Sequence, residues 1–401
     1  MKRLLNLLTL PTRRRVPVGA TPADVMHHEN KWKLLRYRPI PELPRASRTP
    51  LLLIPSLINR HYVLDLMPGK SFVEWLVDQG HDVWIIDWGT PGDEDRYVTF
   101  DEICDGAIGR AVRKVAATSP SGKTHVLGYC LGGTLAAIHA SARPEHIAGL
   151  IGLAAPVSFG EDGLLASWTR SPQFDVNAVA EATGLVPWQL MQASFQMLRP
   201  TLNLSKAVHV IDKAWDDPFL DGFLALETWA NDNVSFPGQA YARYIDALYR
   251  HDEFARGQFR LSGRPARLDA LACPILSVTF THDNIVPLAS AQALVQQAKS
   301  TDKTELELPG GHVGAVVSKA AAGRLWPVIH KWLVAHDVAP LAATAQVEEN
   351  ATGAREAGRA VRRGAVKRAS GAAASDGSGV LTSQRGDSQE AAAPQRRVTT
   401  P

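Results

Sequence analysis

The sequence predicts an α/β fold in which helices cover both faces of a mostly parallel sheet. Short apolar runs that suit buried strands alternate with segments of helical periodicity. A glycine-rich turn around Cys130 joins one apolar run to an apolar helix, and two later runs lead into loops that carry Asp283 and His312. Alternation of strands and helices at this spacing is typical of parallel sheets that are buried on both sides.

The elements before Cys130 follow this alternation. Residues 51–54 predict a buried strand because all four are Leu or Ile, and residues 71–79 predict a helix that glycine ends. Residues 83–86 predict the next strand, and residues 101–118 predict the helix that precedes the strand leading to Cys130.

The elements after Cys130 continue the pattern with one interruption. Residues 146–153, 273–280 and 304–308 predict strands. Between about residue 158 and residue 265 the pattern changes to helices, aromatic residues and loops. This stretch predicts a helical cap inserted between two strands of the sheet.

The turn at Cys130 has the spacing of a nucleophile elbow. Residues 128–133 read Gly-Tyr-Cys-Leu-Gly-Gly, the pattern G-x-S-x-G with cysteine in the place of serine. Glycines two residues either side keep the neighbouring backbone from clashing. A cysteine there sits at the positive end of the following helix, which favours its thiolate. The alternative is a buried cysteine beside a glycine-rich turn.

Three residues on three loops complete a candidate catalytic site. Cys130, Asp283 and His312 appear in the order nucleophile, acid, base, each just after a predicted strand. This is the chain order of α/β-hydrolases and differs from that of chymotrypsin and subtilisin. The sequence therefore predicts an α/β-hydrolase fold with an inserted helical cap.

Further segments resemble those of polyhydroxyalkanoate synthases. Residues 54–66 are similar to the signature after the family's first core strand, residues 82–89 resemble its next strand and turn, and residues 128–134 resemble its cysteine-containing lipase box. The similarity covers roughly residues 35–335. It is strongest to the short catalytic subunit of the two-component, class III enzymes. Ordinary lipases and esterases carry serine at the elbow.

Two features depart from the family pattern. The family often has histidine directly after the catalytic aspartate, where this chain has Asn284 and carries His282 on the other side. We interpret His282 as a loop residue and His312 as the base. The chain also has only about fifty residues before the first core strand, where single-subunit synthases have a long N-terminal domain.

The residue types predict thioester chemistry. His312 is expected to take the proton of Cys130, and Asp283 to orient His312 or to help deprotonate an incoming 3-hydroxyl group. The oxyanion requires two backbone N–H donors, one of which is expected from Leu131, directly after the nucleophile. The resemblance implies that Ile58 supplies the second.

Composition agrees with an ordinary globular protein. The chain has 401 residues, 45% hydrophobic and 21% charged, and its net charge of +3 does not argue for nucleic acid. Three cysteines, Cys104, Cys130 and Cys273, make no disulfide framework and suit a reducing cytoplasm. We expect no cofactor and no metal, since acyl-CoA is the substrate in this interpretation.

The predicted function is polymerisation of (R)-3-hydroxyacyl-CoA into polyester with release of CoA through an acyl-Cys intermediate. One alternative is a Cys-nucleophile hydrolase, such as a thioesterase or a dienelactone-hydrolase-like enzyme, and another is a catalytically silent granule-surface protein. The expected partners are the 3-hydroxyacyl-CoA substrate, the growing polyester or granule surface, and a helical partner subunit. We expect a cytoplasmic, granule-associated homo- or hetero-oligomer.

Three regions are predicted. Residues 1–34 form an N-terminal lead-in whose amphipathic start packs on the fold or touches a lipid-like surface. Residues 35–338 form the α/β-hydrolase catalytic domain with its cap at about 158–265. Residues 339–401 form a disordered tail rich in Ala, Gly and Arg, which contacts a granule, a partner or a polyanion, or is simply solvated.

Overall fold

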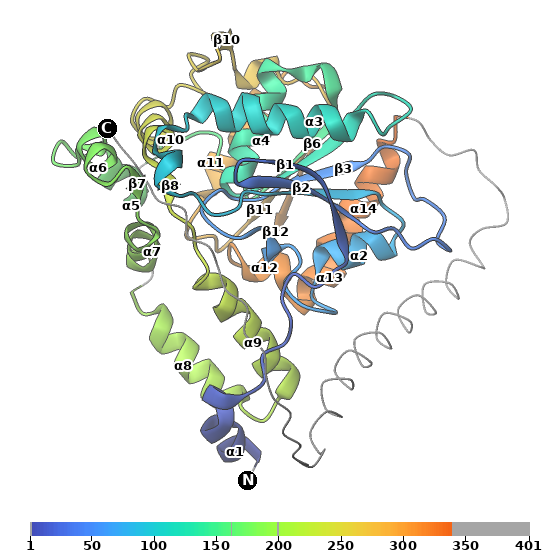
Figure 1. Ribbon diagram of the computed structural model, residues 1–401, viewed down its shortest axis with the longest axis vertical. Coiled ribbons are helices and arrows are strands. Elements are labelled where there is room, and N and C mark those ends of the chain that lie inside the picture. The colour runs from blue at the N-terminus through green and yellow to red at the C-terminus, as the bar shows by residue number, and fades with distance from the viewer. Residues whose placement is uncertain (1, 162, 199, 339–401) are drawn as a thin grey trace, which may run out of the picture. The chain divides into compact units, whose positions relative to one another are not determined.

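The central feature of the computed structural model, which describes residues 2–161, 163–198 and 200–338, is a sheet (Figure 1). Within these residues it has eight strands in the order β1-β2-β4-β3-β5-β6-β11-β12. The strands from β4 to β12 in this order are parallel, whereas β2 pairs antiparallel with both β1 and β4. Their bounds are β1 Ala23–Glu29, β2 Trp32–Tyr37, β3 Leu51–Ile54, β4 Val83–Asp87, β5 Thr124–Tyr129, β6 Ile147–Leu153, β11 Ile275–Phe280 and β12 Lys303–Leu308.

The strands predicted from apolar runs lie where the sequence placed them, and the mostly parallel sheet is confirmed. Strands β1 and β2 were not anticipated. Strand β1 and the first half of β2 lie in the segment assigned to the lead-in, so the sheet begins at Ala23 and a domain boundary at residue 35 would cut β2. Strand β1 is mostly exposed or half-buried and carries little apolar sequence, which explains why periodicity did not reveal it.

Helices cover both faces of the sheet (Figure 1). One face packs against α3, α4 and α11, and the opposite face packs against α2, α13 and α14. The helices around the sheet are α2 Phe72–Asp78, α3 Ile108–Ala116, α4 Leu131–Ala142, α11 Leu288–Gln297, α12 Gly314–Val317, α13 Lys319–Arg324 and α14 Trp326–Ala335. Strands β3, β5 and β6 are buried along their whole length, as expected for parallel strands between two layers of helix.

The helix predicted over residues 101–118 has two parts. A π-helical turn, η4 (Glu102–Ala107), precedes α3. The carbonyl of Cys104 bonds to Nδ1 of the buried His139 at 3.0 Å, and the thiol of Cys104 donates to Leu135 O at 3.3 Å. These contacts with α4 accompany the departure from regular α-helical bonding.

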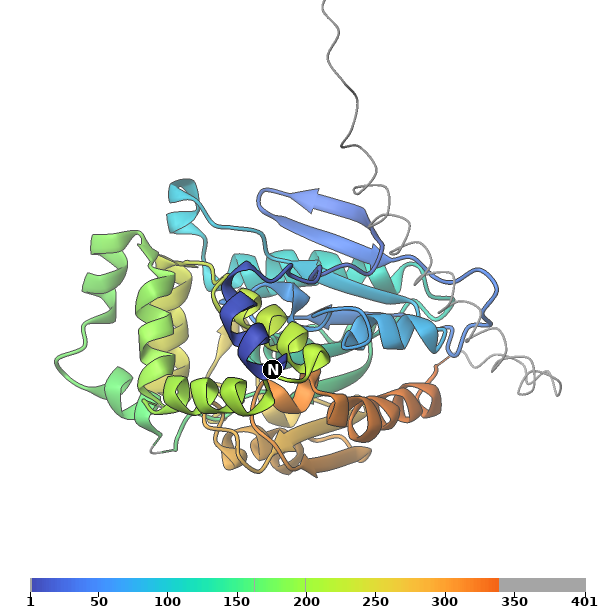
Figure 2. The same ribbon diagram turned by 90° about the horizontal axis from the view of Figure 1, so that it is seen from below.

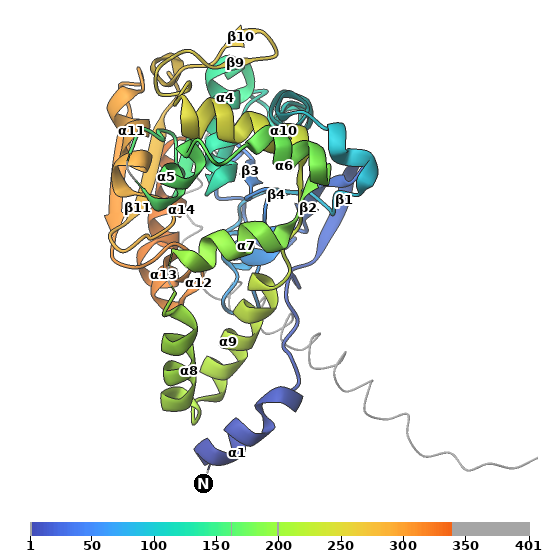
Figure 3. The ribbon, with the colours of Figure 1, turned by 90° about the vertical axis from the view of Figure 1, so that its left-hand side faces the viewer.

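The insertion between β6 and β11 is largely helical, as predicted (Figure 3). Its two-residue strands β7 and β8 pair with each other, and so do β9 and β10. The bounds are α5 Leu164–Arg170, α6 Val176–Thr183, β7 Leu185–Val186, α7 Trp188–Met197, α8 Leu202–Lys213, α9 Asp217–Ala230, β8 Phe236–Pro237, α10 Gly238–Tyr244, the π-helical η6 Ile245–Arg250, β9 Arg260–Leu261 and β10 Arg264–Pro265. Short helical turns complete the described chain: η1 Leu10–Thr12, η2 His61–Val63, η3 Asp93–Tyr97, η5 Pro144–His146 and η7 Leu268–Ala270.

The N-terminal helix α1 (Lys2–Thr9) lies beside α8 and α9 of the cap (Figures 2 and 3). The side chain of Asn6 donates to Ala214 O at 2.8 Å, and Arg13 bonds to Asp221 at 2.8 Å. The lead-in therefore packs on the fold, one of its two expected roles. No helix in the described part of the chain is long and apolar enough to cross a membrane. The predicted tail from residue 339 lies outside the described residues.

Candidate active site

Cys130 sits on a strained turn between β5 and α4. Its backbone has φ +54° and ψ −129°, a conformation that residues with a side chain rarely adopt. The N–H of Cys130 donates to Leu153 O at 3.0 Å, and the helix starts at the next residue. This is the geometry of a nucleophile elbow, as the glycine spacing predicted.

The elbow glycines allow backbone segments to touch. A Cβ on Gly128 would lie 2.3 Å from the Cα of Gly133, and one on Gly132 would lie 2.0 Å from the carbonyl oxygen of Ile54. Both distances are far shorter than a carbon contact allows. Gly132 therefore lets α4 pack directly against the end of β3, which places the loop after β3 beside the nucleophile.

The structure brings the predicted acid and base together with Cys130. His312 Nδ1 lies 2.7 Å from Asp283 Oδ2, and Cys130 is close enough to His312 to interact with it electrostatically. The other carboxylate oxygen of Asp283 accepts the backbone N–H groups of Ile285 and Val286, each at 2.9 Å. Three hydrogen bonds thus fix the Asp283 carboxylate in the orientation that holds His312.

The charges around His312 favour its protonated form. Burial by itself would lower the pKa of His312, but the interaction with the neighbouring Cys130 and the hydrogen bond to Asp283 together raise that pKa to about 10. A cationic imidazole beside a cysteine is the arrangement that nucleophilic Cys-His pairs use.

The other two cysteines are in environments that suppress reactivity. Burial raises the pKa of Cys104 well above its usual value, and burial raises the pKa of Cys273 to about 11. Cys130 differs from both because it lines a cavity and has a charged partner in His312.

The two expected oxyanion donors occupy suitable backbone positions. Leu131 is the first residue of α4, and the first N–H groups of a helix have no acceptor within that helix. Ile58 lies in the loop after β3 and lines the same cavity as Cys130 and His312. Its N–H is paired only loosely, with Ser56 Oγ at 3.4 Å. Both N–H groups therefore retain capacity to bind an oxyanion.

A cavity of about 220 Å³ lies between the core and the cap. The core contributes Cys130, His312 and Ile58, and the cap contributes residues of α7, α8 and α9. Its apolar walls include Trp188, Phe195, Leu198, Leu202, Trp229, Ile285 and Val313. Trp188 and Trp229 of the cap therefore face the candidate site.

Tyr129 and Asn284 also line this cavity, although the sequence did not predict them as site residues. Tyr129 stacks on the His312 ring with centroids 5.3 Å apart, and its hydroxyl donates to His312 O at 3.3 Å. Asn284, noted only as a departure, forms part of the wall. By contrast, the exposed His282 bonds to Thr281 beside it and is not among the residues that line the cavity. Adjacency to Cys130 and to Asp283 was the signal that could have identified Tyr129 and Asn284.

The fold and the elbow define an α/β-hydrolase-fold protein that carries a cysteine at the elbow position. A family model for the α/β hydrolase fold matches residues 49–318, which confirms the predicted fold class. A soluble variant of monoglyceride lipase from Saccharomyces cerevisiae is similar at 13% identity and a TM-score of 0.49, covering 81% of this chain and 100% of that chain.

More specific similarities define the family. A model described as the poly-beta-hydroxybutyrate polymerase (PhaC) N-terminus matches residues 15–76. The poly(3-hydroxyalkanoate) polymerase subunit PhaC of Allochromatium vinosum is 32% identical over 335 residues, 83% of this chain and 92% of that protein. The protein of the same name from Haloferax mediterranei is 32% identical over 319 residues, and the match spans 79% of this chain and 64% of that relative's length. The chain belongs to the poly(3-hydroxyalkanoate) polymerase family, which confirms the resemblance seen in its motifs.

Proposed function

We propose that this chain transfers (R)-3-hydroxyacyl groups from CoA to a growing polyester through an acyl-Cys130 intermediate. The observation that carries the proposal is a cysteine on a strained elbow that shares a cavity with the hydrogen-bonded pair His312–Asp283. Membership of the polymerase family supports the choice of substrate class.

The first step forms the acyl-enzyme. The Cys130 thiolate attacks the thioester carbonyl carbon, and the N–H groups of Leu131 and Ile58 stabilise the oxyanion that develops. When this intermediate collapses, the bond to the CoA sulfur breaks, and the departing thiolate takes the proton from the His312 imidazolium. A thioester replaces a thioester, so this exchange is nearly balanced in energy.

The second step lengthens the polymer. Neutral His312 accepts the proton of a 3-hydroxyl group, and the resulting nucleophile attacks the acyl-Cys130 carbonyl. An ester bond forms, the Cys130 thiolate leaves, and the imidazolium is regenerated. Asp283 orients His312 and stabilises its positive charge in both steps. Both steps need only acyl-CoA, a hydroxyl group and these three side chains. The proposal therefore involves no cofactor and no metal.

The apolar part of the cavity wall suits the alkyl portion of a hydroxyacyl chain. On the cap side this wall includes Trp188 and Phe195 of α7 and Leu198, the residue after α7. On the core side it includes Ile285 and Val313. In the proposed reaction these side chains contact the acyl chain on Cys130. A Cys-nucleophile hydrolase would use the same three residues but would need an open path for water.

The proposal extends to the surroundings of the enzyme. The product is an insoluble polyester, so we propose that the chain works at the surface of polyester granules in the cytoplasm. We also propose that it acts as a homo- or hetero-oligomer with a helical partner subunit. Light scattering of the purified chain, alone and after mixing with a candidate partner, measures whether either assembly forms.

The direct test is to trap the acyl-enzyme. Purified protein is mixed briefly with 3-hydroxybutyryl-CoA, quenched in acid and measured by intact-mass and peptide mass spectrometry. The proposal predicts 3-hydroxybutyryl units on Cys130 and none in a Cys130→Ala variant. Acylation of another residue, or CoA release without any acyl-Cys130, would overturn it.

A further inference from the structure

The loop that follows β3 is joined to the end of the cap. We call Trp229–Val234, at and just after the end of α9, the cap arm. Asn59 and Asn233 form an isolated antiparallel β-bridge, and the N–H of Val234 donates to Ile58 O at 3.1 Å. The side-chain amide of Asn59 donates to that of Asn233. The cap arm therefore runs as a short strand beside the residue expected to bind the oxyanion.

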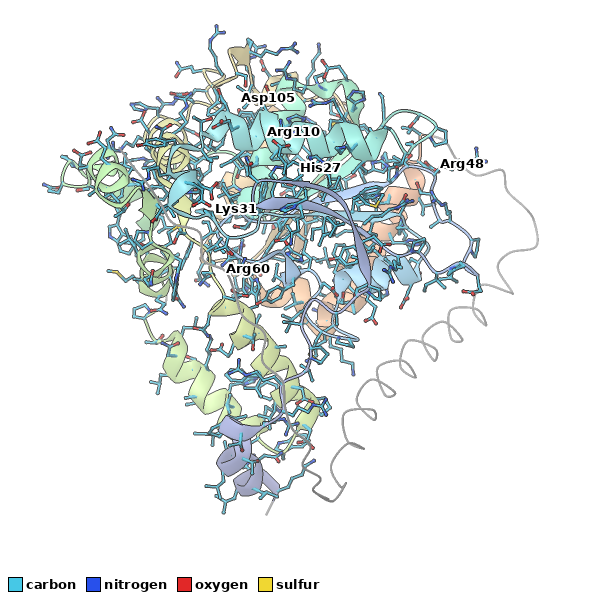
Figure 4. The ribbon with its side chains drawn as sticks, in the orientation of Figure 1. His27, Lys31, Arg48, Arg60, Asp105 and Arg110 are labelled. Carbon is cyan, nitrogen blue, oxygen red and sulfur yellow. The ribbon has the colours of Figure 1, made fainter. Side chains whose placement is uncertain are left out.

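Asp232 ties the cap arm to the next part of this loop. Its carboxylate accepts Arg60 Nε at 3.0 Å through one oxygen and the Tyr62 hydroxyl at 2.7 Å through the other. Trp229 adds a hydrogen bond from its indole N–H to Arg60 O at 2.9 Å. Figure 4 shows Arg60 between the central sheet and α9.

Arg60 also reaches the core. Its Nη1 donates to Gly89 O at 3.0 Å, at the turn that follows β4. Its guanidinium therefore links the cap arm, the loop after β3 and the turn after β4. The side chain of Arg60 is 23% exposed and that of Asp232 is 43% exposed, so the pair contributes modestly to stability. Its geometry is nevertheless specific, because each Asp232 oxygen has a different partner.

The N-terminal side of the loop is held by the core alone. The indole N–H of Trp88 donates to Pro55 O at 3.1 Å. Between this anchor and the cap arm lies the N–H of Ile58, whose own hydrogen bond is the long one to Ser56. An oxyanion donor needs to be fixed within a few tenths of an ångström of its working position. Here that position depends on a cap residue.

We propose that Asp232 is a positioning residue for acyl transfer. It acts through Arg60 and Tyr62 to hold the Ile58 N–H toward the reacting carbonyl. This role rests on the acyl-Cys chemistry of the proposed function but not on which acyl donor the enzyme uses. It also couples the cap to the oxyanion site, because displacement of the cap arm would move the Ile58 backbone.

The test compares two reactions of the same thiolate. Acylation by 4-nitrophenyl butyrate passes through an oxyanion, and its first turnover is followed by nitrophenolate release. Alkylation by iodoacetamide is a displacement at carbon that forms no oxyanion. Asp232→Ala should slow acylation about tenfold, a fraction of the 10²–10³ typical for complete loss of a donor, while alkylation stays within about twofold. Asp232→Asn, which keeps one acceptor oxygen, should recover part of the loss.

Matched controls distinguish loss of the Asp232 contacts from a general loss of folded structure. Asp24→Ala removes another Asp–Arg pair, with Arg38 directly after β2 at 2.7 Å, and should change neither rate. Tyr62→Phe removes a single hydroxyl and should lower acylation in the same direction, even if Asp232→Ala fails to fold. Equal acylation in wild type, Asp232→Asn and Tyr62→Phe would overturn the inference, as would parallel loss of alkylation. Failure of wild type to use 3-hydroxybutyryl-CoA would instead count against the polymerase proposal and leave these rate ratios measurable.

Discussion

At the scale of single residues, the chemistry depends on how differently three cysteines are placed. Cys130 has His312 as a partner, whereas burial raises the pKa of both Cys104 and Cys273. Nucleophilicity follows thiolate character and access, so only the first of these thiols is expected to react quickly near neutral pH.

Replacement of Cys130 should therefore remove activity. Cys130→Ala is expected to abolish CoA release, and Cys130→Ser to retain little, because a hydroxyl needs stronger base assistance than a thiol. Steady-state CoA release measures both variants. In wild type, iodoacetamide should modify Cys130 before Cys104 or Cys273. Substantial turnover by the alanine variant would contradict the mechanism.

Asp283 should be essential, while its neighbour His282 should not. Asp283→Asn removes the negative charge 2.7 Å from His312 Nδ1 and replaces one acceptor oxygen with an NH2 donor, so it should lower kcat by about 10⁴. His282→Ala is the control, since the exposed His282 ring bonds only to the adjacent Thr281 in the described structure. Comparable losses in the two variants, measured as CoA release, would contradict the assignment of His312 as the base.

At the scale of elements, the elbow is a junction of three backbone segments. The tight approach of α4 to β3 occurs at Gly132, where any side chain would meet Ile54 O. The same contact aligns Leu131 with the loop that carries Ile58. Packing and catalytic geometry therefore depend on one residue that has no side chain.

Gly132→Ala should be destabilising. The added methyl would lie 2.0 Å from Ile54 O, so the backbone must shift, at a cost of about 1–3 kcal/mol in the free energy of unfolding. Gly323→Ala in α13 is the matched control, because nothing lies within 4 Å of its added Cβ. Urea unfolding should show loss of stability for the first variant and none for the second. Equal stability of both would contradict the close-contact explanation.

Local sequence patterns predicted the elements but not how they meet. Apolar runs located β3, β4 and β6, and glycine spacing located the elbow. The order Cys130, Asp283, His312 predicted the triad that the structure brings together. Strand β1 was not predicted because it is mostly polar and exposed. The bridge between Asn59 and Asn233 was not predicted because the two residues lie 174 positions apart. No local periodicity in the sequence encodes such a pairing.

At the scale of the whole molecule, several histidines are buried away from the candidate site. Burial lowers the pKa of His125 and of His139 to about 4 each, and that of His81 to about 3. Between about pH 4 and pH 6.5 these rings stay neutral in the folded protein. In the unfolded chain their pKa values are near 6.5, so over the same range they take up protons. Their stabilising contribution is therefore present above about pH 6.5 and is lost as the pH falls toward 4.

His125 offers a test of this acid sensitivity. It is buried on β5 against Trp332, and its titratable neighbours include His336 and Asp337. Each such histidine should lower stability by about 1.4 kcal/mol per pH unit between pH 6.5 and 4. His125→Leu should reduce the slope of unfolding free energy against pH in this range by about that amount. Identical slopes for the two proteins, from urea unfolding at several pH values, would contradict the buried-neutral state.

The central claim is that acyl groups on Cys130 pass to a hydroxyl group and not to water. Incubation of the purified chain with 3-hydroxybutyryl-CoA, with CoA release and both products measured in one sample, tests this claim most directly. We predict that CoA release is matched by polyester, with little free 3-hydroxybutyrate. Stoichiometric free acid without polymer would identify a hydrolase and contradict the account.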